Sequence, residues 1–315
     1  MKSNKYVYPF IPFKNLNNKK LNSKFLSRKT ISIIQLKVEA EAVIPPKIVT
    51  SGKDIDHKIL NIFLNSKIIF GPRKYITDNK EYWIKKINYF TKQGQPILFS
   101  LLGFPFKMPV PIKTNRTLPD MGEVLSLKRI HNITLLIEKI YKPSAKVILY
   151  GEGVFGRFNE LTQKEYKGYI NFLKFLLKGL NLNNNIEIRE LEEMEALSSD
   201  FENQFRSKIT QFTRLYEAKD EAFMKKYNGA KPSLLKVVNT KRITSNLDIL
   251  MDVYNDSKLK ISPEVSKIRE IIKEKTHIML IKYLAYISVR DDLNFLEKSA
   301  PHSLALSVSP KPLRL

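Results

Sequence analysis

Three cations in one proline-rich loop could bind a phosphate group. Lys107, Lys113 and Arg116 follow an apolar run at residues 97–104, and three prolines lie at residues 105–111. Proline restricts φ and removes a backbone donor, so the loop is semi-rigid and its cations are held in place. Each charge-assisted hydrogen bond to a phosphate contributes on the order of 1.5–3 kcal/mol, so two or three such groups suffice for micromolar binding before entropic costs. A solvated basic loop is the alternative in a chain this rich in lysine.

Two carboxylates follow the loop at the expected start of a helix. Pro119 suits the first helical position, and Asp120 and Glu123 lie in the first turn. Negative charge there complements the positive end of the helix. On these residues alone, helix-stabilising charge is the simpler interpretation of both carboxylates.

A predicted strand, loop and helix position these groups. Residues 97–104 are apolar without alternation, which indicates a strand covered on both faces. Residues 119–141 carry apolar side chains at three- and four-residue spacing, which predicts the packing helix of a βαβ unit. In open α/β sheets, ligands bind beyond the carboxyl ends of the strands, so the cations and carboxylates lie where a site is expected.

The remaining periodicity predicts an α/β fold with a Rossmann-like, mainly parallel sheet flanked by helices and an additional helical region. We expect further strands at residues 31–43, 146–150, 186–189 and 304–309, and further helices at residues 54–65, 80–91, 162–180, 190–227, 234–257 and 263–290. Residues 151–157 are expected to form a loop, and Asn-Gly-Ala-Lys-Pro at residues 228–232 the clearest break. The predicted organisation is a basic arm (1–30), an α/β core (31–227), a helical region (228–303) and a final strand returning to the core (304–315).

Composition excludes several kinds of chemistry. The chain of 315 residues has no cysteine, which excludes thiolate nucleophiles, disulfides and cysteine zinc sites. The four histidines lack ligand spacing, so we expect no metal site. Gly151 and Gly153 form a Gly-x-Gly after a strand, a weak signal for a dinucleotide, and no cofactor is expected. No apolar run approaches the roughly 18 residues that span a bilayer, so we expect a cytoplasmic protein without a membrane partner.

The net charge of +23, from 54 Lys and Arg against 31 Asp and Glu, raises the question of a nucleic-acid partner. The lysines are scattered from Lys2 to Lys311 and no recognition motif is present, so we expect no nucleic-acid partner. The positive field should instead attract an anionic small substrate. A nucleic-acid-binding protein stays an alternative, which steeply salt-dependent retention of duplex DNA would support.

The central motif resembles that of a known family. Residues 104–107 read Phe-Pro-Phe-Lys, residues 118–123 read Leu-Pro-Asp-Met-Gly-Glu, and residues 306–315 read Leu-Ser-Val-Ser-Pro-Lys-Pro-Leu-Arg-Leu. These stretches resemble the signature of the pyoverdine/dityrosine biosynthesis family, whose characterised bacterial members are isocyanide (isonitrile) synthases. The resemblance extends over residues 94–315.

The resemblance implies an enzyme of secondary metabolism. It would join the amine of an L-amino acid, tyrosine- or tryptophan-like, to the ketone carbon of ribulose 5-phosphate, without a metal, and its product would pass to an Fe(II)/2-oxoglutarate oxygenase. The resemblance implies catalytic roles for Asp120, Lys107 and Glu123, with Asp120 as the general acid/base or the carboxylate that binds the ammonium group. The residues expected to bind substrate or phosphate are Lys113, Arg116, Glu152, Arg157, Lys311 and Arg314.

Several positions depart from the family pattern. Met108 and Val110 stand where Ser and Asn are usual, and Ser309 stands where His is usual. Glu152 and Arg157 lie in a turn where the family tends to have Asp-Gly-Arg-Val-Phe. The alternative is therefore a diverged member, non-catalytic or with an altered substrate, that still binds a sugar phosphate.

Overall fold

The computed structural model describes residues 54–64, 73–103 and 118–307, apart from 152, 197, 236–237, 245, 247–248, 251–252 and 254–261. All of these residues belong to one compact unit, Ala42–Leu315. The strand predicted at residues 31–43 lies outside the described residues. The division into arm, core, helical region and final strand stays a prediction.

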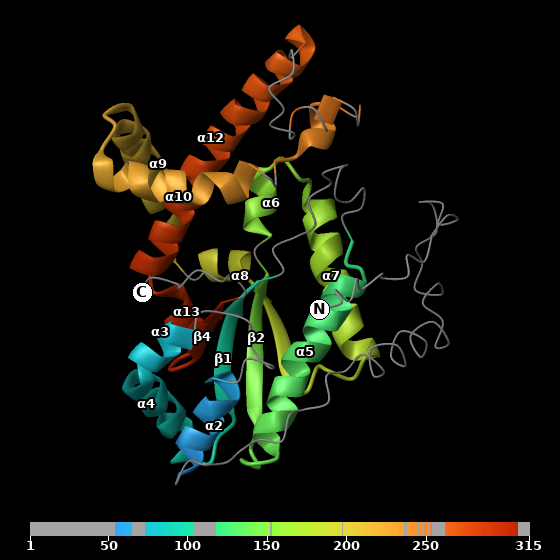
Figure 1. Cartoon of the computed structure of the whole chain (residues 1–315), viewed down its shortest axis with the longest axis vertical. Helices are drawn as coiled ribbons and strands as arrows, with labels where there is room; N and C mark the ends of the chain where they lie inside the picture. The colour runs from blue at the N-terminus through green and yellow to red at the C-terminus, as the bar shows by residue number, and fades with distance from the viewer. Residues whose placement is uncertain are drawn as a thin grey trace, which may run out of the picture. The chain divides into compact units, whose positions relative to one another are not determined.

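A four-stranded parallel sheet organises this unit (Figure 1). Its strands are β1 (Ile97–Leu102), β2 (Ala145–Gly151), β3 (Ile186–Glu190) and β4 (Leu304–Ser307), in the order β3-β2-β1-β4. All three pairings are parallel, and Leu102 pairs with Tyr150 on one side and with Ser307 on the other. The prediction of a buried central strand is confirmed, because β1 lies between β2 and β4. The predicted α/β class with a parallel sheet is confirmed as well.

Helices connect the strands. Three helices precede β1: α2 (Ile55–Leu64), α3 (Arg73–Asp78) and α4 (Lys80–Thr91). Helix α5 (Met121–Glu138) joins β1 to β2, and α6 (Val154–Phe158) and α7 (Gln163–Gly179) join β2 to β3. The elements between β3 and β4 are α8 (Leu191–Glu195), α9 (Phe201–Glu217), α10 (Glu221–Leu235), the 3-10 turn η1 (Thr240–Arg242), α12 (Pro263–Asp292) and α13 (Phe295–Ser299). Because each connection returns to a parallel strand, the helix that follows a strand begins near its carboxyl end. The amino ends of α5 and α6 are therefore expected near the end of the sheet at which its strands terminate.

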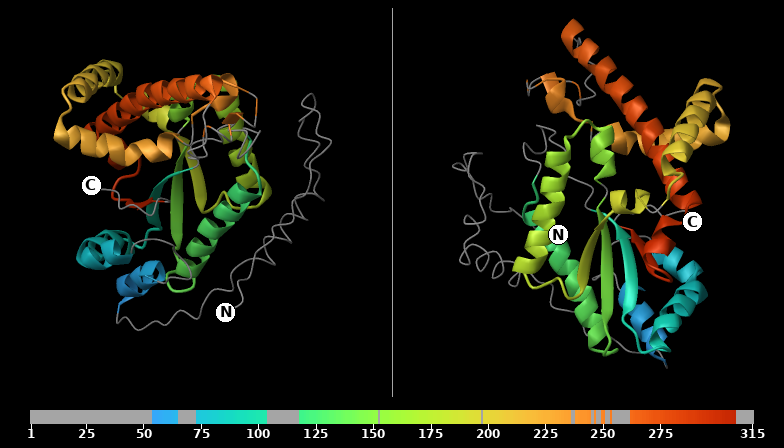
Figure 2. Two further views of the ribbon diagram at one scale, coloured as in Figure 1. Left: turned by 45° about the horizontal axis from the view of Figure 1, so that its top comes forward. Right: turned by 180° about the vertical axis from the view of Figure 1, so that it is seen from behind.

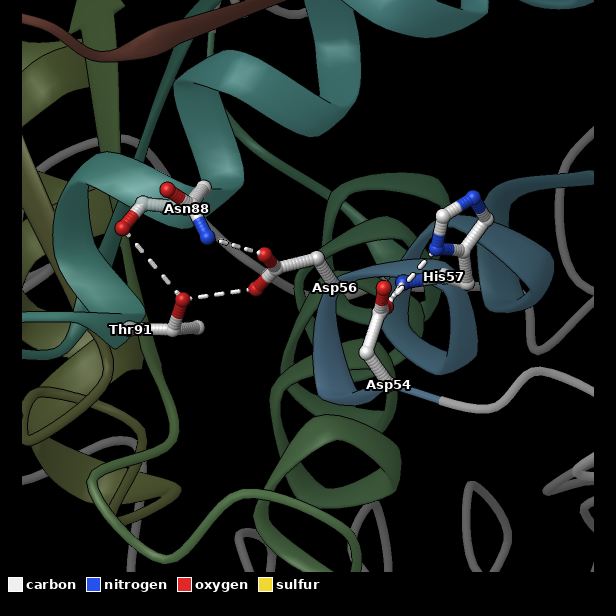
Figure 3. Close-up of polar contacts among 5 residues, drawn as sticks. All are labelled: Asp54, Asp56, His57, Asn88 and Thr91. Carbon is white, nitrogen blue, oxygen red and sulfur yellow. Dashed lines mark hydrogen bonds and ion pairs between the residues drawn. The ribbon is translucent and has the colours of Figure 1, made fainter.

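A polar contact fastens α2 to α4 (Figure 3). Asp56, only 4% exposed, accepts hydrogen bonds from Asn88 Nδ2 at 2.5 Å and from Thr91 Oγ1 at 2.6 Å. At the chain entry to α2, Asp54 Oδ1 accepts from the backbone of His57 at 2.9 Å and lies 2.7 Å from its ring Nδ1. After α4 the chain turns toward β1 through Gly94, whose φ of 63° is strained for any residue with a Cβ.

The apolar face of α7 explains how this helix packs. Its buried residues recur at helical spacing: Tyr166, Tyr169, Ile170, Leu173, Leu176 and Leu177. Complete burial of one such side chain contributes about 1.5–3 kcal/mol, so the stripe fixes which face of α7 meets its neighbours. The two tyrosines are the polar-tipped members of that stripe and lie in its first two turns.

The longest helix, α12, packs against α9 and α10 (Figure 2). Ser262 Oγ accepts from Val265 N at 3.2 Å and Pro263 occupies the first turn, so the predicted start of this helix is confirmed. Between the helices, Phe223, Tyr227, Leu280 and Ile281 form a buried cluster. Tyr227 and His277 face each other there, with 2.9 Å between the tyrosine oxygen and Nδ1.

The break predicted at residues 228–232 is wrong, because α10 continues through it to Leu235. A glycine costs about 1 kcal/mol and an interior proline about 3 kcal/mol in a helix, so local sequence argued for an end here. Buried Phe223 and Tyr227 before the predicted break, and Leu234 after it, pack against α12 and hold both halves in one helix. Tertiary packing outweighs the local preference.

Three other predictions need correction. The tract at residues 190–227 is divided into separate helices, and Lys219, at a φ of 54°, ends the turn between α9 and α10. Residues 151–157 are not all loop, because Val154 and Phe155 begin α6 and bury their side chains among aromatic residues. In the described part of residues 234–257, a 3-10 turn at Thr240–Arg242 replaces a continuous helix. At α6 the burial of Val154 and Phe155 in a core formed by distant segments decides the local structure.

Candidate active site

The strand order creates a switch point between β1 and β4. From β1 the chain proceeds to β2 on one side, while β4 pairs with the other side of β1. In open α/β sheets the crevice for a ligand lies at such a point, beyond the carboxyl ends of the strands. Leu102 and Ser307 are paired, so the segments that follow β1 and β4 leave the sheet from adjacent positions.

Both segments carry predicted site residues. Lys107, Lys113 and Arg116 follow β1, and Lys311 and Arg314 follow β4. All five lie outside the described residues, as does Glu152 after β2. The convergence of the cations stays a prediction, and the adjacent strand ends supply its structural basis.

The predicted carboxylates form the N-terminal cap of α5. Asp120 is the N-cap residue, and its Oδ1 accepts from Gly122 N at 2.8 Å. Glu123 reaches back, so that its Oε2 accepts from Asp120 N at 2.7 Å. This reciprocal arrangement is a capping box, which satisfies backbone donors that the helix itself leaves unpaired. The two carboxylates are therefore brought together by four residues of local sequence.

Tyr169 of α7 contacts this cap from a second element. Its hydroxyl donates to Glu123 Oε1 at 3.2 Å, and its side chain is only 2% exposed. Burial raises the pKa of Tyr169, and the nearby carboxylates of Glu123 and Asp120 raise it further. The hydroxyl therefore keeps its proton and acts as a donor.

Arg157 lies in a different arrangement. Its guanidinium Nη2 donates to both oxygens of Glu195, at 2.8 and 3.0 Å, and its Nε lies 3.6 Å from Glu192. Burial raises the pKa of Glu195, while the guanidinium acts in the opposite direction. The predicted substrate-binding role of Arg157 stays a prediction, and a phosphate would compete with two carboxylates of α8 for this cation.

Two further tyrosines face these glutamates. Burial raises the pKa of Tyr166 to about 12, with an additional contribution from Glu192, and burial together with Glu195 raises that of Tyr286. Sequence reasoning missed Tyr166, Tyr286, Glu192 and Glu195, as well as Tyr169. A signal was present, because Tyr166 and Tyr169 interrupt an apolar stripe at the start of a crossover helix, and an acidic run follows β3.

The glycines after β2 are explained by packing. The interpretation of Gly151 and Gly153 as a pair without the third glycine of a dinucleotide fingerprint is wrong, because Gly156 completes the Gly-x-Gly-x-x-Gly spacing. A Cβ at Gly151 would lie 2.5 Å from Ile170 Cδ1, and one at Gly153 would lie 2.9 Å from Tyr166 Cδ2. These glycines therefore allow α7 to approach the end of β2 closely, which accounts for them without a ligand.

The described residues provide neither a metal-binding cluster nor a membrane-spanning helix. Within them, no three or more His, Cys, Asp and Glu side chains are grouped so that they could hold a metal ion. Of the helices that the structure describes, none is both long and apolar enough to cross a membrane.

Fold and site together define a parallel α/β protein with a carboxylate pair at the start of the crossover helix α5, in contact with α7. The family model described as pyoverdine/dityrosine biosynthesis protein matches residues 87–312, and the chain belongs to this family. The matched region includes β1, α5, the predicted cations Lys107, Lys113 and Arg116, and Lys311, whereas Arg314 lies outside it.

Individual relatives are named isonitrile synthases. An L-tryptophan isonitrile synthase from Fischerella ambigua is 30% identical over 158 residues, which is 46% of this chain and 46% of that protein. An L-tyrosine isonitrile synthase from Xenorhabdus nematophila is 24% identical over 267 residues, 82% of this chain and 74% of that protein. An L-tyrosine isonitrile synthase from Pseudomonas aeruginosa is 30% identical over 121 residues, 38% of this chain. The matches span less than half the length of the Fischerella and Pseudomonas relatives, at 46% and 37%.

A solved structure shows the same fold. The crystal structure of the PvcA protein from Pseudomonas aeruginosa aligns with a TM-score of 0.59 and 21% identity, covering 82% of this chain and 80% of that chain. At this identity the likeness concerns the fold alone.

Proposed function

We propose that this protein is an isonitrile synthase that joins the amine of an L-amino acid, tyrosine- or tryptophan-like, to the ketone carbon of ribulose 5-phosphate. Membership of the family and relatives named for isonitrile synthesis support the reaction class. The observation that carries the proposal is the cap of α5, where Asp120 and Glu123 of the family motif are held together by a capping box.

The chemistry needs a group that handles the substrate ammonium. Asp120 is exposed at the N-cap, and as a carboxylate it can pair with an ammonium group or accept its proton. Its orientation is fixed by the bond from Gly122 N, so the substrate amine would meet a preorganised oxygen. Lys107 would complete the catalytic set from the segment after β1.

The sugar phosphate needs cations. We assign this role to Lys113 and Arg116 after β1 and to Lys311 and Arg314 after β4. The two chain segments that carry them begin after the paired strand residues Leu102 and Ser307. Charge-assisted hydrogen bonds from two or three of them would hold the phosphate while the ketone carbon faces the amine. Glu152 and Arg157 would complete the substrate-binding set.

A second candidate is a diverged member that binds a sugar phosphate without this reaction. One observation favours it: Arg157, predicted to bind substrate, is engaged by Glu195 through two hydrogen bonds. The departures from the family pattern at Met108 and Val110 point in the same direction.

One experiment separates these functions. The purified protein is incubated with ribulose 5-phosphate and each common amino acid in turn, and an isonitrile product is sought by mass. Thermal stabilisation by ribulose 5-phosphate is measured in parallel. Product with one aromatic amino acid supports the synthase. Stabilisation without any product supports the diverged binder, and neither stabilisation nor product contradicts both.

A further inference from the structure

One tyrosine connects the candidate active site to a different crossover helix. Tyr169 of α7 donates to Glu123 Oε1, although 46 residues separate them in sequence. The other oxygen of Glu123, Oε2, accepts from the backbone N–H of Asp120. The glutamate is therefore held from two sides, by a side chain of α7 and by the backbone of its own cap.

The direction of these bonds is well defined. The buried Tyr169 hydroxyl keeps its proton, since burial and two neighbouring carboxylates all raise its pKa. It can therefore donate to Glu123 throughout the physiological pH range. The charged groups of the described residues that act on Tyr169 are Glu123 and Asp120, both at the start of α5. Tyr166, one turn earlier on α7, faces Glu192 instead.

We propose that Tyr169 is a positioning residue, which holds Glu123 and, through it, the backbone of Asp120 in the geometry that the reaction requires. This inference rests on the proposed function, because it gives Tyr169 a role in that same site. Without the hydroxyl, Glu123 loses its contact with α7, so its carboxylate is held less firmly against Asp120 N. One of the two bonds that fix the cap would then weaken. Displacing a reacting group by about 1 Å can cost on the order of a hundredfold in rate.

The alternative is that Tyr169 only fills the core beside Ile170 and Leu173. The Tyr169→Phe variant separates the two, because it keeps the ring and removes one oxygen. If Tyr169 positions the site, turnover of the variant falls roughly tenfold to a hundredfold while KM for ribulose 5-phosphate stays within about twofold. A residue that only fills the core would lower the melting temperature and leave turnover of the folded variant unchanged, and that result would overturn the inference.

A double-mutant cycle tests the route of the effect. Residues that act through one contact give non-additive changes. In a Glu123→Ala background, Tyr169→Phe should therefore alter turnover by less than about twofold. An equally large loss in both backgrounds would show that Tyr169 does not act through Glu123.

A matched control and a measurement without turnover complete the design. Tyr227→Phe also removes a hydroxyl from a buried tyrosine, one that faces His277 at 2.9 Å, and it should leave turnover unchanged. Amide hydrogen exchange at Asp120 N–H should accelerate in Tyr169→Phe and not in Tyr227→Phe. If the wild-type protein makes no isonitrile, the proposed function fails, and unchanged exchange at Asp120 would separately refute the link between Tyr169 and the cap.

Discussion

Substitution of Asp120 separates its structural role from its chemical one. As N-cap of α5, Asp120 accepts from Gly122 N at 2.8 Å. Asparagine caps a helix about as well as aspartate but lacks the negative charge, so Asp120→Asn should cost only about 0.3–1 kcal/mol of the free energy of unfolding. Asp120→Ala removes the cap itself and should cost about 0.5–2 kcal/mol.

The two variants should differ in stability but lose similar amounts of activity. If Asp120 accepts the ammonium proton, both variants lose the base, and turnover should fall by about 10²–10⁴ in each. Binding of ribulose 5-phosphate should change little in either variant, since the cations proposed to bind the phosphate are other residues. The assays are urea unfolding for stability, isonitrile formation by mass for turnover, and thermal shift for sugar-phosphate binding.

The chain offers a control with the same local structure. At the start of α7, Thr162 and Glu165 form a second capping box, with Glu165 N donating to Thr162 Oγ1 at 3.3 Å and Thr162 N donating to Glu165 Oε2 at 2.7 Å. Thr162→Ala should destabilise the protein by a similar 0.5–2 kcal/mol, roughly as Asp120→Ala does, and leave turnover of the folded protein intact. If Asp120→Asn retains turnover within tenfold of wild type, the carboxylate is a helix cap and the reasoning about its chemistry is wrong.

Three further predictions concern phosphate binding and stability. Lys107→Ala should weaken binding of ribulose 5-phosphate or turnover by about 1.5–3 kcal/mol, roughly tenfold to a hundredfold, and a variant with unchanged kinetics would remove this residue from the site. Asp56→Ala leaves two donors of α4 without their buried acceptor, so urea unfolding should show a loss of about 1–3 kcal/mol, whereas a neutral result would mean that water replaces the carboxylate. Gly153→Ala would place a Cβ 2.9 Å from the ring of Tyr166 and should destabilise by about 1–3 kcal/mol. The control Gly168→Ala lies inside α7, where a Cβ would meet nothing within 4 Å, and should stabilise by up to about 1 kcal/mol; equal effects of the two glycine variants would contradict the packing argument.

Features governed by neighbours in sequence were predicted well. Local sequence predicted a helix starting at Pro119 with Asp120 and Glu123 in its first turn; α5 begins at Met121, and Asp120 is the N-cap of a capping box that was not predicted. Strand β1 was predicted because it has no polar alternation, which is typical of a strand covered on both faces. The start of α12 at Ser262 and Pro263 follows from the same kind of local chemistry.

Features governed by packing between distant segments were not predicted from the sequence. The Gly-x-x-Pro sequence in α10 argues for a break, and only contact with α12 reveals a continuous helix. The glycines at 151, 153 and 156 have the spacing of a phosphate-binding turn, yet the structure uses at least the first two to admit side chains of α7. Local spacing could not distinguish these uses, because both require a residue without a Cβ.

The sequence by itself therefore determined which groups could act at this site, since the family motif and the helix cap are continuous in the chain. The tertiary structure decided their neighbours. Tyr169 reaches Glu123 across 46 residues, and Arg157 reaches Glu195 across 38, because crossover helices return to adjacent parallel strands and bring their first turns to one edge of the sheet. No periodicity within either segment specifies which side chain of the other it will meet, so these contacts depend on the packing of whole helices.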